Sequence, residues 1–217
     1  MKLLCFSGLG ADERMFSRLN LEHELIHIHW EKPEPNETLQ QYANRFKRFI
    51  PEGETYGFIG LSFGGIIAQV LAQHFNPQYL ILISTLGHSS DIIPYYRLAK
   101  FMPSGLPLTS LAKFAPKPLF NFVFGANESS TRQILYETIF ESDNDFIEWA
   151  IPQAIKFSGT SYKAHHVLQI HGLRDKLISC PDSDNLCKID GGHLLVYEQA
   201  EEVSKLINDF IKKAPAK

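Results

Sequence analysis

The stretch Thr55–Phe75, TYGFIGLSFGGIIAQVLAQHF, contains the strongest structural signal in the sequence. Residues 55–61 form an apolar run typical of a buried strand, and residues 63–75 follow as a helix. The junction, residues 60–64, reads GLSFG and fits a G-x-S-x-G pattern. At such a sharp turn the serine is held in a strained backbone conformation, and glycines two positions away on either side relieve the crowding. The stretch therefore predicts that Ser62 is presented at the carboxyl end of a strand.

Strand and helix patterns alternate on both sides of this turn. Apolar runs predict strands, and apolar residues at helical spacing predict the helices between them. The predicted strands are 2–7, 24–30, 55–61, 79–86, 166–171 and 185–190, and the predicted helices are 38–50, 63–75 and 194–211. This alternation indicates an α/β fold, with a mostly parallel six-stranded sheet and helices on both faces.

The alternation stops between residues 87 and 162, which contain six of the twelve prolines in the chain: Pro94, Pro103, Pro107, Pro116, Pro118 and Pro152. A helix through Glu141 is expected to be capped by Ser129 or Ser130, and another, reaching Phe157, by Asp143 or Asn144. Many of its apolar residues are aromatic: Tyr95, Tyr96, Phe101, Phe114, Phe120, Phe122, Phe124, Tyr136, Phe140, Phe146, Trp149 and Phe157. We expect one domain, 1–217, in which 87–162 forms a helical cap or lid.

Composition excludes several classes of protein. The chain has 217 residues, 44% apolar and 21% charged, with a net charge of −3 and no long charged run. It therefore lacks the basic surface that nucleic acids or anionic lipids require. No apolar stretch approaches the roughly 20 residues of a membrane-spanning helix. Three cysteines without a C-x-x-C pair argue against disulfides and structural zinc. We expect a cytoplasmic protein without a membrane partner, and the oligomeric state is open.

A serine hydroxyl becomes a good nucleophile only when an imidazole takes its proton and an acid orients that imidazole. The expected chain order is serine, acid, histidine. Asp175 follows the predicted strand 166–171, and His193 follows the last predicted strand. Because open α/β sheets place their sites at the carboxyl ends of strands, Ser62, Asp175 and His193 are predicted to meet. The helix that begins after Ser62 points its first amides at the nucleophile, which makes the Phe63 N–H a candidate oxyanion donor.

Four other carboxylates compete with Asp175 for the role of the acid. Asp91 follows the strand that ends near residue 86, while Asp182, Asp184 and Asp190 lie close to His193 in sequence. We favour Asp175, because Asp190 belongs to the end of a predicted strand and the other two resemble solvated loop residues.

Together these segments resemble the α/β-hydrolase superfamily over nearly the whole chain. Residues 60–64 are similar to the nucleophile elbow of that family, residues 171–175, HGLRD, to its H-G-x-x-D segment, and Gly192-His193 to its terminal G-H. Residues 7–10, SGLG, resemble its oxyanion loop, which is usually H-G-x-G, and this implies that the Leu9 N–H is the second oxyanion donor. Ser7 departs from the usual histidine.

Two further departures concern the size of the fold. The first two strands of the family are missing, and only 17 residues separate Asp175 from His193, so the usual intervening helix is shortened or lost. The resemblance therefore implies a compact member with about six strands.

Other residues are weaker candidates. Gly8, Arg14, His88 and Trp149 are possible substrate-binding residues, because each lies in a predicted loop or lid near the serine. Histidines 27, 29, 165, 166 and 171 lack well-spaced carboxylate or cysteine partners, so we expect no metal site and no cofactor.

The resemblance implies a serine hydrolase that cleaves a small carboxylic ester or thioester through an acyl-enzyme on Ser62. Two alternatives remain open. One is a carbon–carbon bond hydrolase or lyase with the same triad, and the other is a ligand receptor without catalysis, since a fold alone does not guarantee activity.

Overall fold

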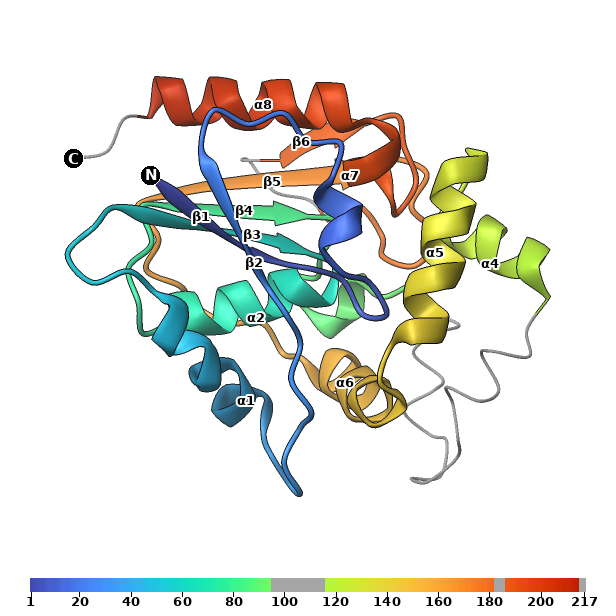
Figure 1. Ribbon diagram of the computed structural model, residues 1–217, viewed down its shortest axis with the longest axis horizontal. Coiled ribbons are helices and arrows are strands. Elements are labelled where there is room, and N and C mark those ends of the chain that lie inside the picture. The colour runs from blue at the N-terminus through green and yellow to red at the C-terminus, as the bar shows by residue number, and fades with distance from the viewer. Residues whose placement is uncertain (95–115, 182–185, 215–217) are drawn as a thin grey trace.

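The computed structural model describes residues 1–94, 116–181 and 186–214, and it contains one six-stranded sheet (Figure 1). The strand order is β2-β1-β3-β4-β5-β6, and all five neighbouring pairs are parallel. The strands are β1 Lys2–Phe6, β2 Glu24–Ile28, β3 Tyr56–Leu61, β4 Tyr79–Ile83, β5 His166–Gly172 and β6 Leu186–Ile189. The α/β class and the six-stranded sheet predicted from the sequence are confirmed.

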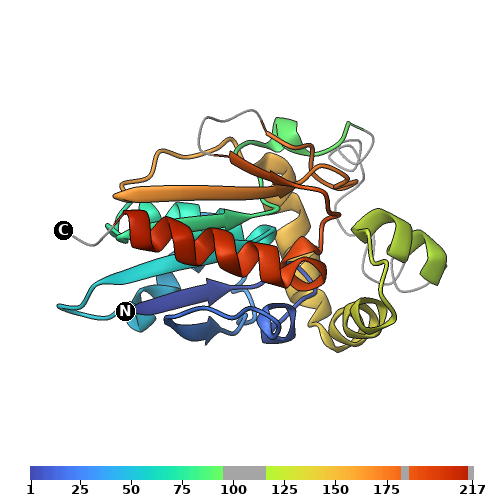
Figure 2. The ribbon, with the colours of Figure 1, turned by 90° about the horizontal axis from the view of Figure 1, so that it is seen from above.

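Helices cover both faces of the sheet (Figures 1 and 2). One face carries α1 Leu39–Arg45, α2 Phe63–Ala72 and α6 Asn144–Lys156, and the other carries α7 Leu195–Glu198 and α8 Ala200–Lys213. The helices α4 Lys117–Phe124 and α5 Ser129–Glu141 lie beyond the carboxyl ends of the strands. Three short 3-10 turns, Glu13–Phe16, Phe46–Phe49 and Ser89–Asp91, complete the described elements. None of the helices in these residue ranges has the length and apolar character that crossing a membrane requires.

The strands divide the core into two layers because successive side chains point to opposite faces. In β1, Leu4 and Phe6 pack against α1 and α2, whereas Leu3 and Cys5 pack toward α8. All five residues of the central strand β4 are buried. This double burial explains why parallel strands of this kind read as continuous apolar runs.

Several element ends differ from the sequence expectation. The strand expected over 24–30 ends at Ile28, because its partner β1 ends opposite it at Phe6. The strand expected to reach residue 86 ends at Ile83, since Ser84 adopts a positive φ of 45° and turns the chain away. The helix expected over 63–75 ends at Ala72, and the last helix is divided at Gln199, whose backbone leaves the helical region.

The segment between β4 and β5 contains α4, α5 and α6, which we call the insertion helices. Asp143 caps α6, as one of the two expected caps, by accepting from the amides of Asp145 and Phe146. For α5 the expectation was wrong: its N-cap is Glu128, which makes no side-chain capping bond. Six of the residues named above for this segment lie outside the described residues: Tyr95, Tyr96, Phe101, Pro103, Pro107 and Phe114.

Candidate active site

Ser62 lies at the turn between β3 and α2 with φ 52° and ψ −117°, a conformation that residues with a side chain rarely adopt. The surrounding backbone explains the two glycines of the motif. A Cβ at Gly64 would overlap the carbonyl oxygens of Phe6 and Ser7, and one at Gly60 would overlap the backbone of Gly65. Ser62 is therefore held in place by contacts between backbone atoms, which only glycines at these positions permit.

Three side chains from distant parts of the chain lie in a row. The Oγ atom of Ser62 is 3.0 Å from Nε2 of His193, and Nδ1 of His193 is 2.7 Å from Oδ2 of Asp175. His193 begins the turn after β6, and Asp175 lies in the turn after β5, so both follow carboxyl ends of neighbouring strands. The structure thus brings together the three residues that the sequence selected.

The carboxylate of Asp175 is fully buried, and every contact it makes is with a donor. Its Oδ1 atom accepts from the amides of Leu177 at 2.9 Å and Ile178 at 3.0 Å, while Oδ2 accepts from His193. Burial by itself raises the pKa of Asp175, but the charge of His193 and these hydrogen bonds outweigh it and hold the pKa below its usual value. The carboxylate is therefore ionised and can orient the imidazole of His193 at neutral pH.

The competing carboxylates are placed elsewhere. Oδ2 of Asp91 accepts from the amides of Gly87 and His88, both at 2.9 Å, and so closes its own turn. Asp190 forms an exposed ion pair with Arg174. Asp182 and Asp184 lie outside the described residues.

The two expected oxyanion donors, the amides of Leu9 and Phe63, make no hydrogen bond within the described residues. Phe63 is the first residue of α2, whose first amides have no partners inside the helix. Three hydrogen bonds stabilise the loop that carries Leu9. Ser7 Oγ donates to Ala11 O at 2.8 Å, Ala11 N donates to Gly8 O at 3.2 Å, and Trp30 Nε1 donates to the same Gly8 oxygen at 3.3 Å. Ser7, at the position where the H-G-x-G pattern has histidine, thus stabilises this loop by a side-chain hydrogen bond.

Two apolar cavities meet at Ser62 and His193, and we call them the larger and the smaller lobe. The larger has a volume of about 180 Å³ and the smaller about 150 Å³. Leu9 and Leu177 border both. The larger lobe is further lined by residues that include Gly8, Met15, Phe124 and Leu135, and the smaller by residues that include Ile66, Leu86, Ile92, Ala154 and Ile178. Each lobe therefore has part of its wall in the insertion helices.

Of the four possible substrate-binding residues, only Gly8 lines a lobe. The guanidinium of Arg14 is taken up by carboxylates, at 2.6 Å from Asp12 Oδ2 and 3.2 Å from Glu137 Oε2, with Glu141 as a third partner. Arg14 therefore lies outside both lobes, and its charge is paired with carboxylates of its own chain.

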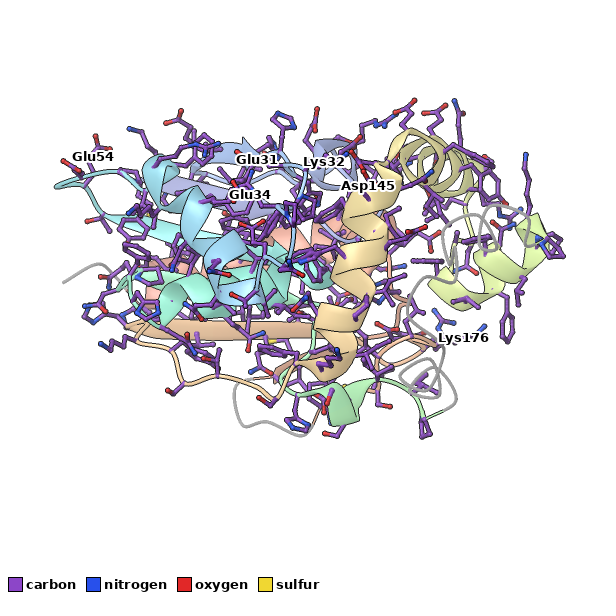
Figure 3. The ribbon with its side chains drawn as sticks, turned by 90° about the horizontal axis from the view of Figure 1, so that it is seen from below. Glu31, Lys32, Glu34, Glu54, Asp145 and Lys176 are labelled. Atoms are coloured by element: carbon purple, nitrogen blue, oxygen red, sulfur yellow. The ribbon has the colours of Figure 1, made fainter. Side chains whose placement is uncertain are left out.

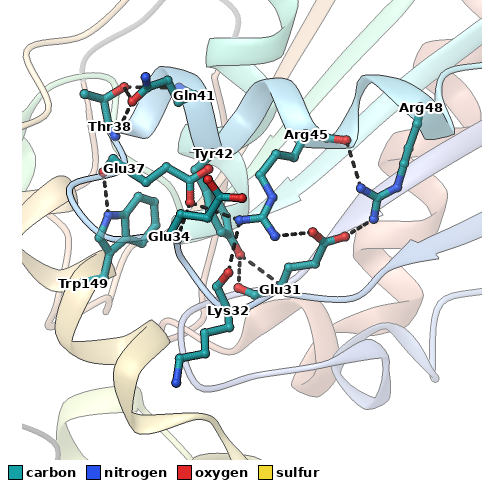
Figure 4. Close-up of polar contacts among 10 residues, drawn as sticks. All are labelled: Glu31, Lys32, Glu34, Glu37, Thr38, Gln41, Tyr42, Arg45, Arg48 and Trp149. Atoms are coloured by element: carbon teal, nitrogen blue, oxygen red, sulfur yellow. Dashed lines mark hydrogen bonds and ion pairs between the residues drawn. The ribbon is translucent and has the colours of Figure 1, made fainter.

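The other two also have structural partners. Nδ1 of His88 accepts from the amide of Ser90 at 3.0 Å and caps a short turn outside both lobes. Trp149 lies on α6, and its Nε1 donates to the carbonyl oxygen of Glu37 at 2.8 Å (Figure 4). The segment that carries Glu37 is itself held by Arg45 and Arg48, which pair with Glu31 and Glu37. Trp149 thus attaches an insertion helix to the sheet domain instead of facing a lobe.

Within the described residues, no group of three or more histidine, cysteine, aspartate or glutamate side chains is arranged to hold a metal ion. His29 contacts Glu13, and His27 lies against the ring of Phe16. His165 precedes β5 and His166 begins it, at the end of the sheet opposite Ser62. His171 is different, because it lies beside Asp175.

Three residues that contribute to this site were not selected from the sequence: Leu177, Ile178 and Trp30. The amides of Leu177 and Ile178 donate to the acid. In an Asx turn an aspartate accepts from amides that follow it closely in the chain, so the position of Asp175 could have suggested them. Trp30 supports the loop of Leu9, but only the pairing of β2 with β1 brings it there.

No protein-family model and no curated protein matches the sequence. Solved structures do match. A thermophilic esterase from Thermogutta terrifontis superposes with a TM-score of 0.76 and 16% identity, over 100% of this chain and 91% of that one. A lipase-esterase related protein from Clostridium acetobutylicum gives 0.71 and 18%, over 97% and 94%. An extracellular alpha/beta-hydrolase from a Paenibacillus species gives 0.67 and 13%, over 97% and 98%. The chain has the α/β-hydrolase fold.

Proposed function

We propose that this protein is a serine hydrolase that cleaves a carboxylic ester or thioester through an acyl-enzyme on Ser62. The observation that carries the proposal is the continuous row from Ser62 Oγ through His193 to the buried Asp175 carboxylate, beside two amides without acceptors. The similarity in fold to esterases and other hydrolases supports it.

The chemistry follows from the positions of the donors and acceptors. Nε2 of His193 takes the proton of Ser62 as Oγ attacks the substrate carbonyl carbon, and Asp175 stabilises the imidazolium that forms. The negative charge moves to the carbonyl oxygen, which the amides of Leu9 and Phe63 stabilise. His193 then gives the proton to the leaving alcohol or thiol. Water attacks the acyl-enzyme by the same route in reverse and regenerates Ser62.

The two lobes define the size of substrate that fits. A dry cavity of about 150 Å³ holds one benzene molecule, so each lobe accepts a group of about six carbon atoms. Because both lobes meet at Ser62, one holds the acyl chain and the other the leaving group. We therefore propose a small ester or thioester with an apolar group on each side of the bond, and the insertion helices 117–156 as a cap that completes both lobes.

A fluorophosphonate probe tests the activated serine directly. We expect intact-mass labelling of the wild-type chain at one site, and loss of labelling in Ser62→Ala. His193→Ala is expected to slow labelling by about a thousandfold or more, because the base is gone. The control is Ser90→Ala, which removes an exposed hydroxyl outside both lobes.

The probe also separates the alternatives. No labelling of the wild type would contradict the proposal and favour a ligand receptor. Labelling without turnover of phenyl acetate, phenyl butyrate and their thioester analogues would favour carbon–carbon bond cleavage by the same serine.

A further inference from the structure

A second imidazole lies beside Asp175 and approaches Oδ2, the same oxygen that His193 contacts. His171 is the sixth residue of β5 and is 1% exposed. Its Nε2 atom is 3.1 Å from the carbonyl oxygen of Ile178 and 3.5 Å from Oδ2 of Asp175. Both oxygens are acceptors, so Nε2 carries the ring proton and donates it. Burial lowers the pKa of His171, which favours this neutral form.

The segment that His171 contacts is the one that binds the acid, residues 175–178, which we call the acid loop. The Ile178 residue accepts from His171 through its carbonyl oxygen and donates to Asp175 Oδ1 through its amide. The position of Ile178 therefore decides where the carboxylate lies. On its other side the loop is paired with Ile92 in an antiparallel bridge, and Ile93 N donates to Leu177 O at 3.2 Å. His171 adds a side-chain support from within the sheet, beside the backbone bond from Asp175 N to Gly172 O at 3.2 Å.

We infer that His171 is a positioning residue: by holding the carbonyl of Ile178 and lying against Asp175, it fixes the carboxylate that orients His193. The inference rests on the proposed function. His171 lines neither lobe, so it acts on the rate of the chemical step and not on substrate binding. A carboxylate that can rotate away from His193 leaves the imidazole in a wrong tautomer or orientation for part of the time.

The test compares His171→Gln with His171→Met, two unbranched side chains of equal length. Glutamine places an N–H donor near the position of Nε2, whereas methionine fills the space without a donor. We expect His171→Met to lower kcat for phenyl acetate by about ten- to a hundredfold, as for other residues that orient a catalytic group, with KM changed by less than about twofold. His171→Gln is expected to restore kcat to within about threefold of the wild type.

A matched control lies on the same strand. His166→Met makes the same change five positions earlier, where Nε2 is buried without a partner and the ring stacks on Tyr79. It removes no hydrogen bond of that atom, so we expect wild-type kcat. Equal losses in His166→Met and His171→Met would overturn the inference, because they would reflect the general stability of β5.

A double-mutant cycle separates positioning from a global structural effect. If His171 acts through Asp175, its replacement by methionine costs less than about twofold in kcat when Asp175→Asn is already present. A penalty that is the same in both backgrounds would overturn the inference.

Two further outcomes are covered. If circular dichroism shows that His171→Met is unfolded, His171→Asn replaces it in the test. The asparagine amide is one carbon too short to reach Ile178 O. Equal kcat values for the Gln and Asn variants would then contradict the inference. If Ser62→Ala retains wild-type ester hydrolysis, the proposed function fails instead. Loss in Ser62→Ala together with wild-type kcat in His171→Met rejects the role of His171 alone.

Discussion

The floor and the roof of the site are held by different kinds of contact. The floor is the turn around Ser62, where a Cβ at Gly60 or Gly64 would overlap backbone atoms. The roof consists of the insertion helices, which are attached by side chains: α6 packs into the core through Phe146 and Ala150, and exposed ion pairs add further contacts. Arg14 reaches Glu137 and Glu141 on α5.

Figure 3 shows a second attachment of the roof, the Lys32–Asp145 pair, where the chain before α1 meets α6. Its side chains are 67% and 60% exposed, so the pair contributes little to stability. Lys176, also labelled in Figure 3, extends from the acid loop and lies over the ring of Phe122 on α4, 3.3 Å from its centroid.

This difference indicates which part of the site tolerates amino-acid substitutions. In the floor, close packing of backbone atoms leaves no room for a side chain at Gly60 or Gly64, so the position of Ser62 cannot change. Exposed ion pairs contribute about 0 to 1 kcal/mol each, so the exposed side chains of the roof can be altered at small cost. The roof is therefore where substrate preference can be adjusted without loss of the reaction.

The largest expected effect comes from Asp175, which lies in the acid loop and reaches Ser62 through His193. Asp175→Asn is expected to lower kcat by about 10⁴-fold, because an amide favours the wrong tautomer of the imidazole. The control is Asp91→Asn, which keeps an oxygen acceptor for the amides of Gly87 and His88 and should retain kcat within about threefold. Steady-state kinetics with phenyl acetate measures both. Loss in Asp91→Asn with activity kept in Asp175→Asn would reverse our assignment of the acid.

The next effect is on folding of the floor. Gly64→Ala is expected to lower the free energy of unfolding by about 4 kcal/mol or more, since the new methyl group overlaps the carbonyl oxygens of Phe6 and Ser7. Urea denaturation measures the loss. In Gly87→Ala the added Cβ meets only Asp91 Oδ2, at 3.4 Å, so the change should stay within about 0.5 kcal/mol. Similar values for the two variants would show that the floor tolerates side chains after all.

A smaller effect is expected where the roof meets substrate. Ala154→Leu adds three carbon atoms to the wall of the smaller lobe. We expect kcat/KM to fall about ten- to a hundredfold for whichever of the acyl or leaving groups occupies that lobe, and little for substrates with a small group there. Gln153→Leu, on the same helix but outside both lobes, is the control. An unchanged substrate profile in Ala154→Leu would contradict the two-lobe proposal.

The smallest effect is expected for the ion pairs of the roof. Arg14→Met should lower the free energy of unfolding by about 1 kcal/mol at low salt, and this difference should largely vanish in 1 M NaCl. Urea denaturation of wild type and variant at both salt concentrations measures it. Arg174→Met, which breaks an exposed pair remote from α5, is the control.

The pH dependence of this contribution follows from Asp12. Its burial opposes ionisation, but the hydrogen bonds and charge of Arg14 outweigh it and hold the pKa of Asp12 below 3.8. The contribution is therefore complete above about pH 4 and is lost as the pH falls through the lower, folded-state pKa. A difference between wild type and Arg14→Met that persists in high salt or increases below pH 3 would contradict this account.

Much of the fold was predictable because it depends on short segments. The run at 55–61, the glycines at 60 and 64 and the apolar strand at 79–83 each indicate their structure locally, and buried parallel strands have a distinctive pattern. The roles of Arg14 and Trp149 were not predictable, because each depends on a partner from another element. Glu137 and Glu141, for example, are more than 120 residues from Arg14 along the chain.

By itself, the sequence determined the order of the serine, acid and histidine motifs along the chain. It also determined the backbone conformation of Ser62, since crowding between neighbouring peptide groups is a local property. Only the tertiary structure decided which carboxylate reaches His193, which cations are already neutralised, and how large the two lobes are. Those features depend on distances between segments far apart in the chain, and such distances are set when the helices and strands pack together.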